Sequence, residues 1–327
     1  MAEGTRRANN NAVAEDAPLV VAVCTFRRPA VTETLSSLFG QTRLPDRIVV
    51  IDNDDLPSTA ARIAEAAKGA PVPVTFRHAP SQNIAIARNA ALDVAPRSRL
   101  AFIDDDEVAA PDWLERLEAA LAPGLAAVFG PSIATYPPEA PTWMQTLSPH
   151  SQFVSLKRGG VVTGHTANCL IDLRDPALAG HRFQEALGRR GAEDSDFFDR
   201  AFARGANFAL APDALVYEPV TPDRMAFGWL LRRRFRHGRA HGRRHGEKNA
   251  FGLMISALAK TGYCGVDAAL HAFSPAGRNR AILRGALHAG IAAGAATMRR
   301  GEATQAAPAL TPVDPAEKLS PKPSTGR

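Results

Sequence analysis

One stretch constrains this chain more than any other, the run Leu100–Glu107, in which four apolar residues are followed by four acids. An apolar run of this kind predicts a strand buried in a mainly parallel sheet, and ligands bind beyond the carboxyl ends of such strands. Adjacent acids repel one another unless a cation or solvent compensates their charge. Since side chains alternate along a strand, we expect Asp104 and Asp106 on one side and Asp105 on the other. Two carboxylates on one side suit Mg²⁺ or Mn²⁺, whereas a solvated acidic turn is the alternative.

The first part of the chain alternates between strand-like and helix-like segments. Apolar, β-branched runs predict strands at 19–26, 47–51, 72–76, 100–104 and 126–129. Helical patterns separate them at 31–39, from 57 onward, at 83–94 and at 113–121. This alternation predicts an α/β fold, a Rossmann-like mainly parallel sheet flanked by helices and joined by right-handed crossovers. The second strand ends in Asp52, so Asp52 and the acids after Ile103 should share one edge of the sheet.

The rest of the chain is less regular. Residues 131–165 are rich in Pro, Ser and Gly and predict a long functional loop. Strands are expected at 167–173 and 208–217, a helix before Gly205, a basic helix at 222–245 and a closing helix from Ile282 to Met298. We expect this division: a disordered tail at 1–17, a catalytic domain at 18–220 with halves 18–130 and 131–220, a helical extension at 221–300 and a disordered tail at 301–327.

Positive charge is concentrated in one segment. The formal net charge is +6, and the seven arginines between Arg232 and Arg244, with no acid among them, contribute +7. Such a patch indicates an anionic partner, either diphosphate, anionic lipid or nucleic acid. Three widely spaced cysteines without a CxxC pair predict free thiols in a reducing compartment. With neither an apolar signal region at the start nor an apolar run long enough to span a membrane, we expect a cytoplasmic protein.

Several common motifs are missing from the sequence. GxGxxG does not follow the first strand, and neither GxxxxGK[ST] nor GxSxG occurs. These absences disfavour a dinucleotide-dependent dehydrogenase, a P-loop enzyme and a nucleophile-elbow hydrolase. The chemistry is therefore expected from carboxylates, arginines and a metal.

Six segments in a fixed order carry a resemblance to a known family. They are Val23–Pro29 (VCTFRRP), Ser37–Thr42 (SLFGQT), Ile48–Asn53 (IVVIDN), Ala87–Asn89 (ARN), Phe102–Leu114 (FIDDDE, then PDWL) and Ala192–Asp194 (AED). Together they resemble glycosyltransferase family 2 and, within it, bacterial exopolysaccharide enzymes of the ExoM, or succinoglycan glucosyltransferase, type. Each segment alone is a weak signal, but their order and spacing from Pro18 to His245 are specific.

The resemblance implies a GT-A fold and an inverting transfer of a sugar from a nucleotide sugar, usually a UDP-sugar, to an acceptor hydroxyl. By the family's motifs, the residues that border the nucleotide would be Thr25, Arg27, Asp52, Arg88, Asp104 and Asp105. Asp106, assisted by Asp104, would hold Mg²⁺ or Mn²⁺. Asp194 resembles the general base, which takes the proton of the acceptor hydroxyl while metal and arginine stabilise the departing diphosphate.

On the acceptor side the resemblance points to Glu193, His165 and Asn168, and to Arg236 and His237 as contacts to a diphosphate. The chain lacks the Gln-x-x-Arg-Trp motif of processive members, which implies addition of a single sugar. A glycan linked to polyprenyl diphosphate would suit these features. The enzyme would then work at the inner face of the cell membrane, with 282–298 as an interfacial helix on anionic lipid.

Each assignment has an alternative. Asp52 could cap the following turn, Arg88 could be a surface residue, and Glu193 and Asp194 could be acids that favour a helix N-terminus. A metal-dependent nucleotidyltransferase would also use strand-end carboxylates, but it would not need the base Asp194. A nucleic-acid-binding protein built on the arginine segment would leave the acidic strand ends unexplained, so we expect no nucleic-acid partner.

Overall fold

The computed structural model describes residues 17–154, 156, 160–189 and 191–297. The predicted tails, apart from Ala17, and the end of the predicted 282–298 helix lie outside the described residues. Within them, one sheet has the strand order β3-β2-β1-β4-β8-β6-β9 and a small second sheet the order β5-β10-β7. The strands are β1 (Leu19–Thr25), β2 (Arg47–Asp52), β3 (Val74–His78), β4 (Arg99–Asp104), β5 (Val108–Ala109), β6 (Ala127–Phe129), β7 (Ser132–Thr135), β8 (Asn168–Asp172), β9 (Phe208–Leu210) and β10 (Val216–Pro219).

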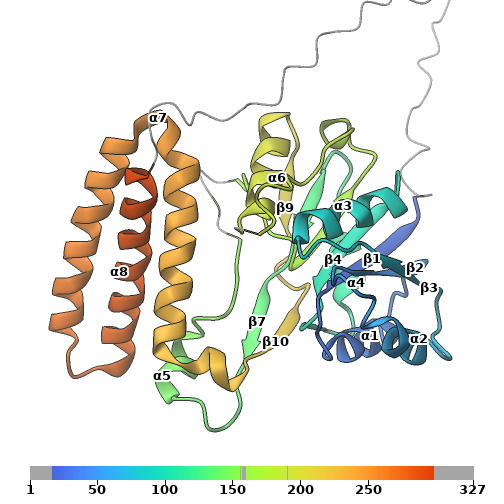
Figure 1. Ribbon diagram of the computed structural model, residues 1–327, viewed down its shortest axis with the longest axis horizontal. Coiled ribbons are helices and arrows are strands. Elements are labelled where there is room, and N and C mark those ends of the chain that lie inside the picture. The colour runs from blue at the N-terminus through green and yellow to red at the C-terminus, as the bar shows by residue number, and fades with distance from the viewer. Residues whose placement is uncertain (1–16, 155, 157–159, 190, 298–327) are drawn as a thin grey trace, which may run out of the picture.

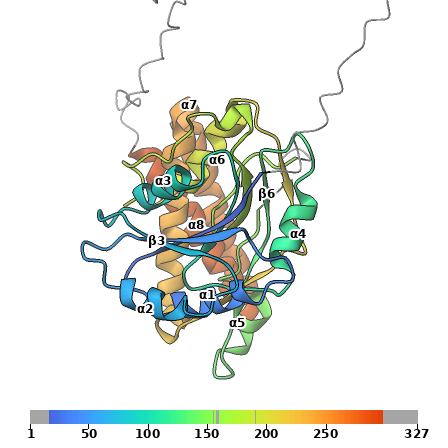
Figure 2. The same cartoon turned by 90° about the vertical axis from the view of Figure 1, so that its right-hand side faces the viewer.

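Helices cover both faces of the large sheet (Figures 1 and 2). They are α1 (Val31–Phe39), α2 (Ala60–Ala66), α3 (Ile84–Val94), α4 (Trp113–Ala120), α5 (Thr142–Leu147), α6 (Glu193–Ala203), α7 (Phe227–Leu270) and α8 (Pro275–Ala296), with 3₁₀ turns at Pro176–Leu178 and Pro222–Met225. One buried cluster joins the sheet to α3 and α6, and a second joins the other face to α1, α2 and α4. Alternate β1 residues supply the two clusters, because a strand presents successive side chains to opposite faces.

The sheet is mainly parallel, as the sequence predicts. Strands β3, β2, β1 and β4 run parallel, whereas β8 is antiparallel to both β4 and β6. The register pairs Thr25 with Asp52 and Cys24 with Asp104, so the carboxyl ends of β2, β1 and β4 are level. The prediction that Asp52 and Asp104 share one edge of the sheet is therefore confirmed.

Two predictions for the middle of the chain are wrong. The expected loop at 131–165 contains β7 and α5. Both elements are short and lie in a sequence rich in Pro, Ser and Gly, so no periodic apolar pattern marks them. The single strand expected at 208–217 is two strands, β9 in the large sheet and β10 in the small one. Pro212 lies between them and cannot donate a backbone hydrogen bond to a sheet, so the chain leaves the first sheet there.

The carboxyl-terminal helices form a separate bundle beside the sheet domain (Figure 1). The expected basic helix at 222–245 begins with a 3₁₀ turn and continues as α7 to Leu270. Asn249 leaves helical geometry (φ −159°, ψ 72°) and its Oδ1 accepts a hydrogen bond from the Gly252 amide at 2.8 Å. Asn249 therefore caps a new helix, and α7 consists of a proximal half before this residue and a distal half after it.

Glycines allow the proximal half of α7 to pack closely against α8. A Cβ on Gly238 would lie 2.0 Å from the Leu287 carbonyl oxygen, and one on Gly242 would lie 2.2 Å from that of Ile291. Gly290 and Gly294 of α8 meet the α7 backbone in the same way. These spacings of four residues place the glycines on one face of each helix, where a larger residue would separate the two backbones.

The structure also corrects the prediction that 282–298 is an interfacial helix. This segment belongs to α8, whose buried residues include Leu283, Ile291, Ala292 and Ala295. Helix α8 packs against both halves of α7, so its apolar side is covered within the bundle.

Candidate active site

The turn after β4 separates the three aspartates. Strand β4 ends at Asp104, whose side chain is 43% exposed, and Asp105 turns back into the protein. The Asp105 carboxylate accepts hydrogen bonds from the Thr25 hydroxyl at 2.8 Å and the Phe26 amide at 3.3 Å. Burial raises the pKa of Asp105 to about 6, although Arg28 opposes the shift. Asp105 and Thr25 therefore tie the end of β4 to the end of β1, while Asp104 stays accessible.

The buried side chain of Glu107 holds the same turn through hydrogen bonds. Its Oε2 accepts a hydrogen bond from the Asp104 amide at 3.0 Å, and its Oε1 accepts one from the Ser132 hydroxyl at 2.5 Å. The side chain is buried, and burial raises its pKa well above the ordinary value, with Asp104 adding to the shift. Glu107 therefore has a structural role in this turn, whereas Asp104 does not share its burial.

Asp106 lies between two arginines that the sequence does not single out. Its Oδ2 accepts hydrogen bonds from Arg28 and, at 3.2 Å, from Arg224, which also pairs with Glu218. Arg28 follows β1, whereas Arg224 lies just before α7, so two segments far apart in the sequence supply the cations at Asp106. An anion with several oxygens, such as a diphosphate, would meet both arginines here.

The loop after β2 is organised around Asp52. This carboxyl is fully buried and accepts hydrogen bonds from the Thr59 hydroxyl, the Thr59 amide at 3.3 Å and the Asp54 amide at 3.0 Å. Arg27, exposed and in a left-handed conformation (φ 56°), pairs with Asp54 at 2.7 Å. The turn-capping alternative accounts for these contacts of Asp52, and Arg27 is the accessible group of this corner.

Arg88 connects the β4 end to the start of α6. It is 7% exposed, which excludes the surface alternative, and it pairs with Glu193 and, at 3.9 Å, with Asp104. Burial raises the pKa of Glu193 and the Arg88 charge opposes this, so the pair stays together in the interior. Two acids 89 positions apart in sequence, Asp104 and Glu193, thereby meet at one guanidinium.

Asp194 occupies the first turn of α6. Ala192, immediately before the helix, is left-handed (φ 73°), a conformation that costs a non-glycine residue about 1–2 kcal/mol. Such strain is often retained at functional sites. The Ser195 amide donates a hydrogen bond to Asp194 Oδ1 at 2.6 Å. Glu193 takes the pairing with Arg88, whereas Asp194 is partly exposed.

His165 and Asn168 differ in their surroundings. Both ring nitrogens of His165 are shielded from solvent and have no hydrogen-bond partner among the described residues, as have the hydroxyls of Thr163 and Thr166. Burial lowers the pKa of His165, although Asp194 and Asp104 oppose the shift, so the ring is held neutral. This concentration of unpaired polar atoms is what a site for a polar ligand requires.

Asn168, by contrast, is fully used by the fold. Its Oδ1 accepts from the Trp113 indole at 2.8 Å, and its Nδ2 donates to the carbonyls of Pro131 at 2.9 Å and Ala214 at 2.7 Å. These bonds join both sheets beneath the site, which is a structural role. The acceptor-side expectation therefore rests on His165.

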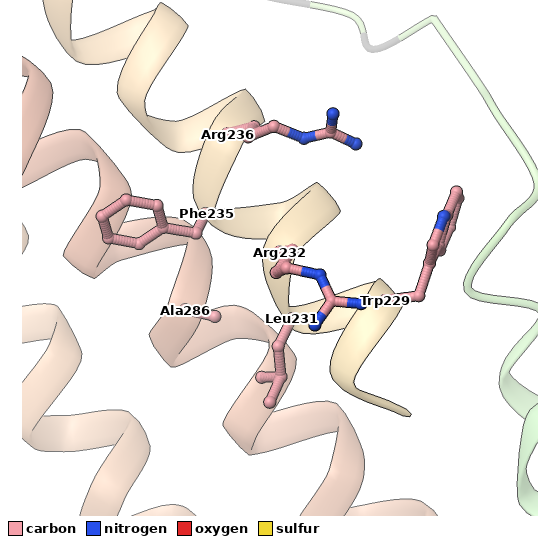
Figure 3. A pocket seen from close by; sticks show the side chains of 6 residues that line it. All are labelled: Trp229, Leu231, Arg232, Phe235, Arg236 and Ala286. Atoms are coloured by element: carbon pink, nitrogen blue, oxygen red, sulfur yellow. The ribbon is translucent and has the colours of Figure 1, made fainter. Parts of the chain in front are cut away.

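An open groove of about 530 Å³ lies on the proximal half of α7 (Figure 3). Its lining comes from Trp229, Leu231, Arg232, Phe235 and Arg236 of α7 and Ala286 of α8. In Figure 3, Arg232 and Arg236 extend on the side of Trp229, whereas Phe235 points toward α8. The groove is thus apolar with two cationic groups at one side.

The groove is connected to the acidic turn. The Trp229 ring lies 5.8 Å from the Arg224 guanidinium carbon, and Arg224 binds Asp106. The Trp229 ring also stacks on the His150 ring, with 5.5 Å between the two ring centres. His237, exposed on the next turn, has a lowered pKa because of partial desolvation and three neighbouring arginines. Trp229 and Arg224 are therefore functional candidates that only the folded chain identifies.

Comparison with known proteins places these features in a family. The sequence model described as "Glycosyl transferase family 2" matches residues 20–175. The succinoglycan biosynthesis protein ExoM of Rhizobium meliloti (strain 1021) is 42% identical over 283 residues, which cover 84% of this chain and 91% of that protein. The solved mannosyltransferase PcManGT from Pyrobaculum calidifontis, in complex with GDP-Man and Mn²⁺, aligns over 84% of this chain and 88% of its own with a TM-score of 0.55 and 18% identity.

The fold and the site therefore define a glycosyltransferase with a GT-A-like mixed sheet and a carboxyl-terminal helical bundle. More particularly, the chain belongs to glycosyltransferase family 2. The expected family and the expected enzyme class are both confirmed.

Proposed function

We propose that this enzyme moves one sugar from a UDP-sugar to a hydroxyl of a lipid-linked glycan, with inversion, in exopolysaccharide assembly. The relative named for succinoglycan biosynthesis supports the pathway, because it matches nearly its whole length. The acceptor would be carried on polyprenyl diphosphate at the cytoplasmic face of the membrane. A single transfer per binding event agrees with the missing processive motif.

One observation carries the proposal: Arg88 joins Asp104, at the carboxyl end of β4, to the Glu193-Asp194 pair. A glycosyltransferase needs a donor site and a base next to each other, because the acceptor hydroxyl attacks the sugar carbon that the diphosphate leaves. The buried Arg88 holds these two parts in fixed relation. A nucleotidyltransferase would need the acidic turn but not Asp194.

A divalent metal fits the donor set at this edge. Mg²⁺ and Mn²⁺ prefer oxygen ligands and are commonly held by one or two carboxylates together with substrate phosphates. Asp106 is the proposed metal ligand, and Asp104 would assist it. Both hydrogen bonds to Asp106 use Oδ2, which leaves Oδ1 for a metal, and the side chain of Asp104 is accessible. A bound metal would act as a Lewis acid toward the departing diphosphate.

The chain's own cations would bind the same diphosphate. Arg28 and Arg224, which pair with Asp106, would contact the oxygens of a diphosphate bound there. Arg27, which is exposed and pairs with Asp54 in the loop after β2, would lie next to the nucleotide. Thr25, Asp52 and Asp105 would support the nucleotide site indirectly, because their hydrogen bonds hold the loops that follow β1 and β2. Preorganised charges of this kind stabilise developing negative charge without rearranging during the reaction.

Asp194 would take the proton of the acceptor hydroxyl. The side chain lies in the first turn of α6 and is partly exposed, so a hydroxyl can approach. The neutral His165 and the unpaired hydroxyls of Thr163 and Thr166 would orient the acceptor sugar through hydrogen bonds. Glu193 would position the base by anchoring the first turn of α6 to Arg88.

The groove on α7 would receive the lipid-linked end of the acceptor. Its apolar lining suits an isoprenoid chain, and Arg232 and Arg236 suit a diphosphate. The connection through Trp229 and Arg224 to Asp106 would bring the glycan toward the base. His237, exposed on the same helix, would add a polar contact at the diphosphate.

The test is transfer of radiolabelled sugar from UDP-glucose, and from other nucleotide sugars, into an extract of lipid-linked glycans. Asp194→Asn should reduce turnover by about 10²–10⁴-fold, the usual value of a general base. The matched control is Asp196→Asn, which alters a neighbouring acid of α6 that pairs with Arg200, and it should retain transfer. Full turnover by Asp194→Asn would contradict the assignment and favour nucleotidyl transfer.

A further inference from the structure

The distal half of α7 exposes large apolar side chains along one face. They are Phe251 (71% exposed), Ile255 (48%), Leu258 (51%), Val266 (61%), Leu270 (79%) and, just beyond the helix, Phe273 (103%). We call these six residues the apolar stripe. Their spacings of three, four and eight residues keep them on one side of the helix, so they form one continuous face along it. Scattered exposed apolar residues are ordinary, but a contiguous stripe indicates an interaction surface.

The stripe is unusual because the opposite side of the same helix is also apolar. Ala257 and Cys264 are buried against α8, where Leu253 and Met254 join the packing. Between Ala250 and Leu270 the charged residues are Lys260 and Asp267, and neither continues the spacing of the stripe. A helix that is apolar on all sides is normally covered by protein or by lipid.

Charge decides between a second copy of the chain and a membrane. The bundle, residues 227–296, contains twelve arginines and lysines and two acids, a net charge of +10. Two such bundles placed face to face would repel each other, whereas anionic headgroups would neutralise them. Arg278, Arg280 and Arg284 are exposed and follow the end of the stripe directly, so cations lie next to the apolar face.

We propose that the distal half of α7 docks the enzyme on an anionic lipid bilayer, with the apolar stripe in the boundary between headgroups and acyl chains. Amphipathic helices bind in this way through buried apolar area and attraction of cations to anionic lipid. No helix in the described part of the chain is long and apolar enough to cross a bilayer. The docking helix is the outer member of the bundle, on the side away from the sheet (Figure 1).

This surface complements the proposed function, since a lipid-linked acceptor is confined to a membrane, but it rests on different residues. The groove of the acceptor proposal is on the proximal half of α7, and the stripe is on the distal half. Loss of docking and loss of sugar transfer can therefore be measured separately.

The experiment is co-sedimentation of the full chain with vesicles of phosphatidylcholine alone or of phosphatidylcholine mixed with the anionic lipid phosphatidylglycerol. We expect binding to the anionic vesicles, weakening as salt rises. The double variant Ile255→Ser/Leu258→Ser should have a vesicle partition coefficient at least about tenfold lower than the wild type, because each apolar side chain contributes to burial in the bilayer. The matched control is Leu56→Ser, which removes an even more exposed leucine (73%) from the sheet domain and should bind like the wild type.

Binding of UDP with Mn²⁺, measured on each variant, shows whether the sheet domain remains intact. Wild-type protein that ignores anionic vesicles at low salt would overturn the proposal. So would equal losses in the double variant and in Leu56→Ser. A stable dimer in sedimentation, dissociated by the double variant and accompanied by no vesicle binding, would assign the stripe to a second copy of the chain instead.

Discussion

The edge of the sheet and the helical bundle both carry many charges, but they use them differently. At the edge, arginines and acids compensate one another: Arg88 with Glu193, Arg224 with Asp106, Arg27 with Asp54. On α7, six arginines have no ion pair with any acid that the structure describes: Arg232, Arg233, Arg234, Arg236, Arg239 and Arg243. The charges at the edge are therefore largely balanced, whereas the bundle carries an excess of positive charge, which suits the anionic partners proposed for it.

The largest effect is expected where the edge depends on a buried charge. Arg88→Ala would leave the buried Glu193 without its partner, and breaking such a pair costs about 3–5 kcal/mol. The free energy of unfolding, from urea titration, measures this. The control Arg182→Ala removes the half-exposed partner of Asp93 and should cost no more than about 1 kcal/mol. Equal effects of the two variants would contradict the anchoring role of Arg88.

A substitution of intermediate effect tests the close packing of the bundle. Gly238→Ala would place a Cβ 2.0 Å from the Leu287 carbonyl oxygen, and overpacking of this kind costs about 1–3 kcal/mol. Gly262→Ala, on the distal half of α7 with nothing within 4 Å, should instead stabilise by about 0.5–1 kcal/mol through helix propensity. Opposite shifts of the melting temperature are expected, and shifts of the same sign would show that the glycines do not set the distance between the helices.

A smaller effect concerns the pH dependence of the edge. Burial raises the pKa of Asp105 to about 6, above its value in the unfolded chain, so folding takes up a proton. Stability from this group is present at low pH and is lost as pH rises from about 4 to about 6, at about 1.4 kcal/mol per unit. The difference in unfolding free energy between wild type and Asp105→Asn should follow this slope. A difference that does not vary with pH would show that folding leaves the pKa of Asp105 unchanged.

The sequence predicts the edge better than the bundle for a physical reason. A buried strand needs an apolar run, and the acids that follow it mark where the strand ends, so β1, β2 and β4 and the aspartates are visible locally. The partners of these aspartates are not visible: Arg224 lies 118 residues from Asp106, and topology alone brings them together. Arg28 and Trp229 were missed for the same reason.

The bundle shows what local patterns conceal. The glycines at 238 and 242 allow close contact with the backbone of α8, which local sequence does not show. The sequence predicts a helical extension at 221–300, but nothing in the pattern of 251–273 says which side of the helix is covered. Sequence alone therefore assigned the interfacial helix to 282–298, and the structure places the exposed apolar face on the distal half of α7.

The central claim is that the edge, and not the arginine bundle, binds the donor. Calorimetric titration of UDP with Mn²⁺ into wild type, Asp106→Asn and Arg236→Gln tests it most directly, with near-UV circular dichroism to confirm folding. The account predicts tight binding by the wild type, loss of binding in Asp106→Asn or without Mn²⁺, and unchanged binding in Arg236→Gln. Binding that survives in Asp106→Asn and disappears in Arg236→Gln would contradict it.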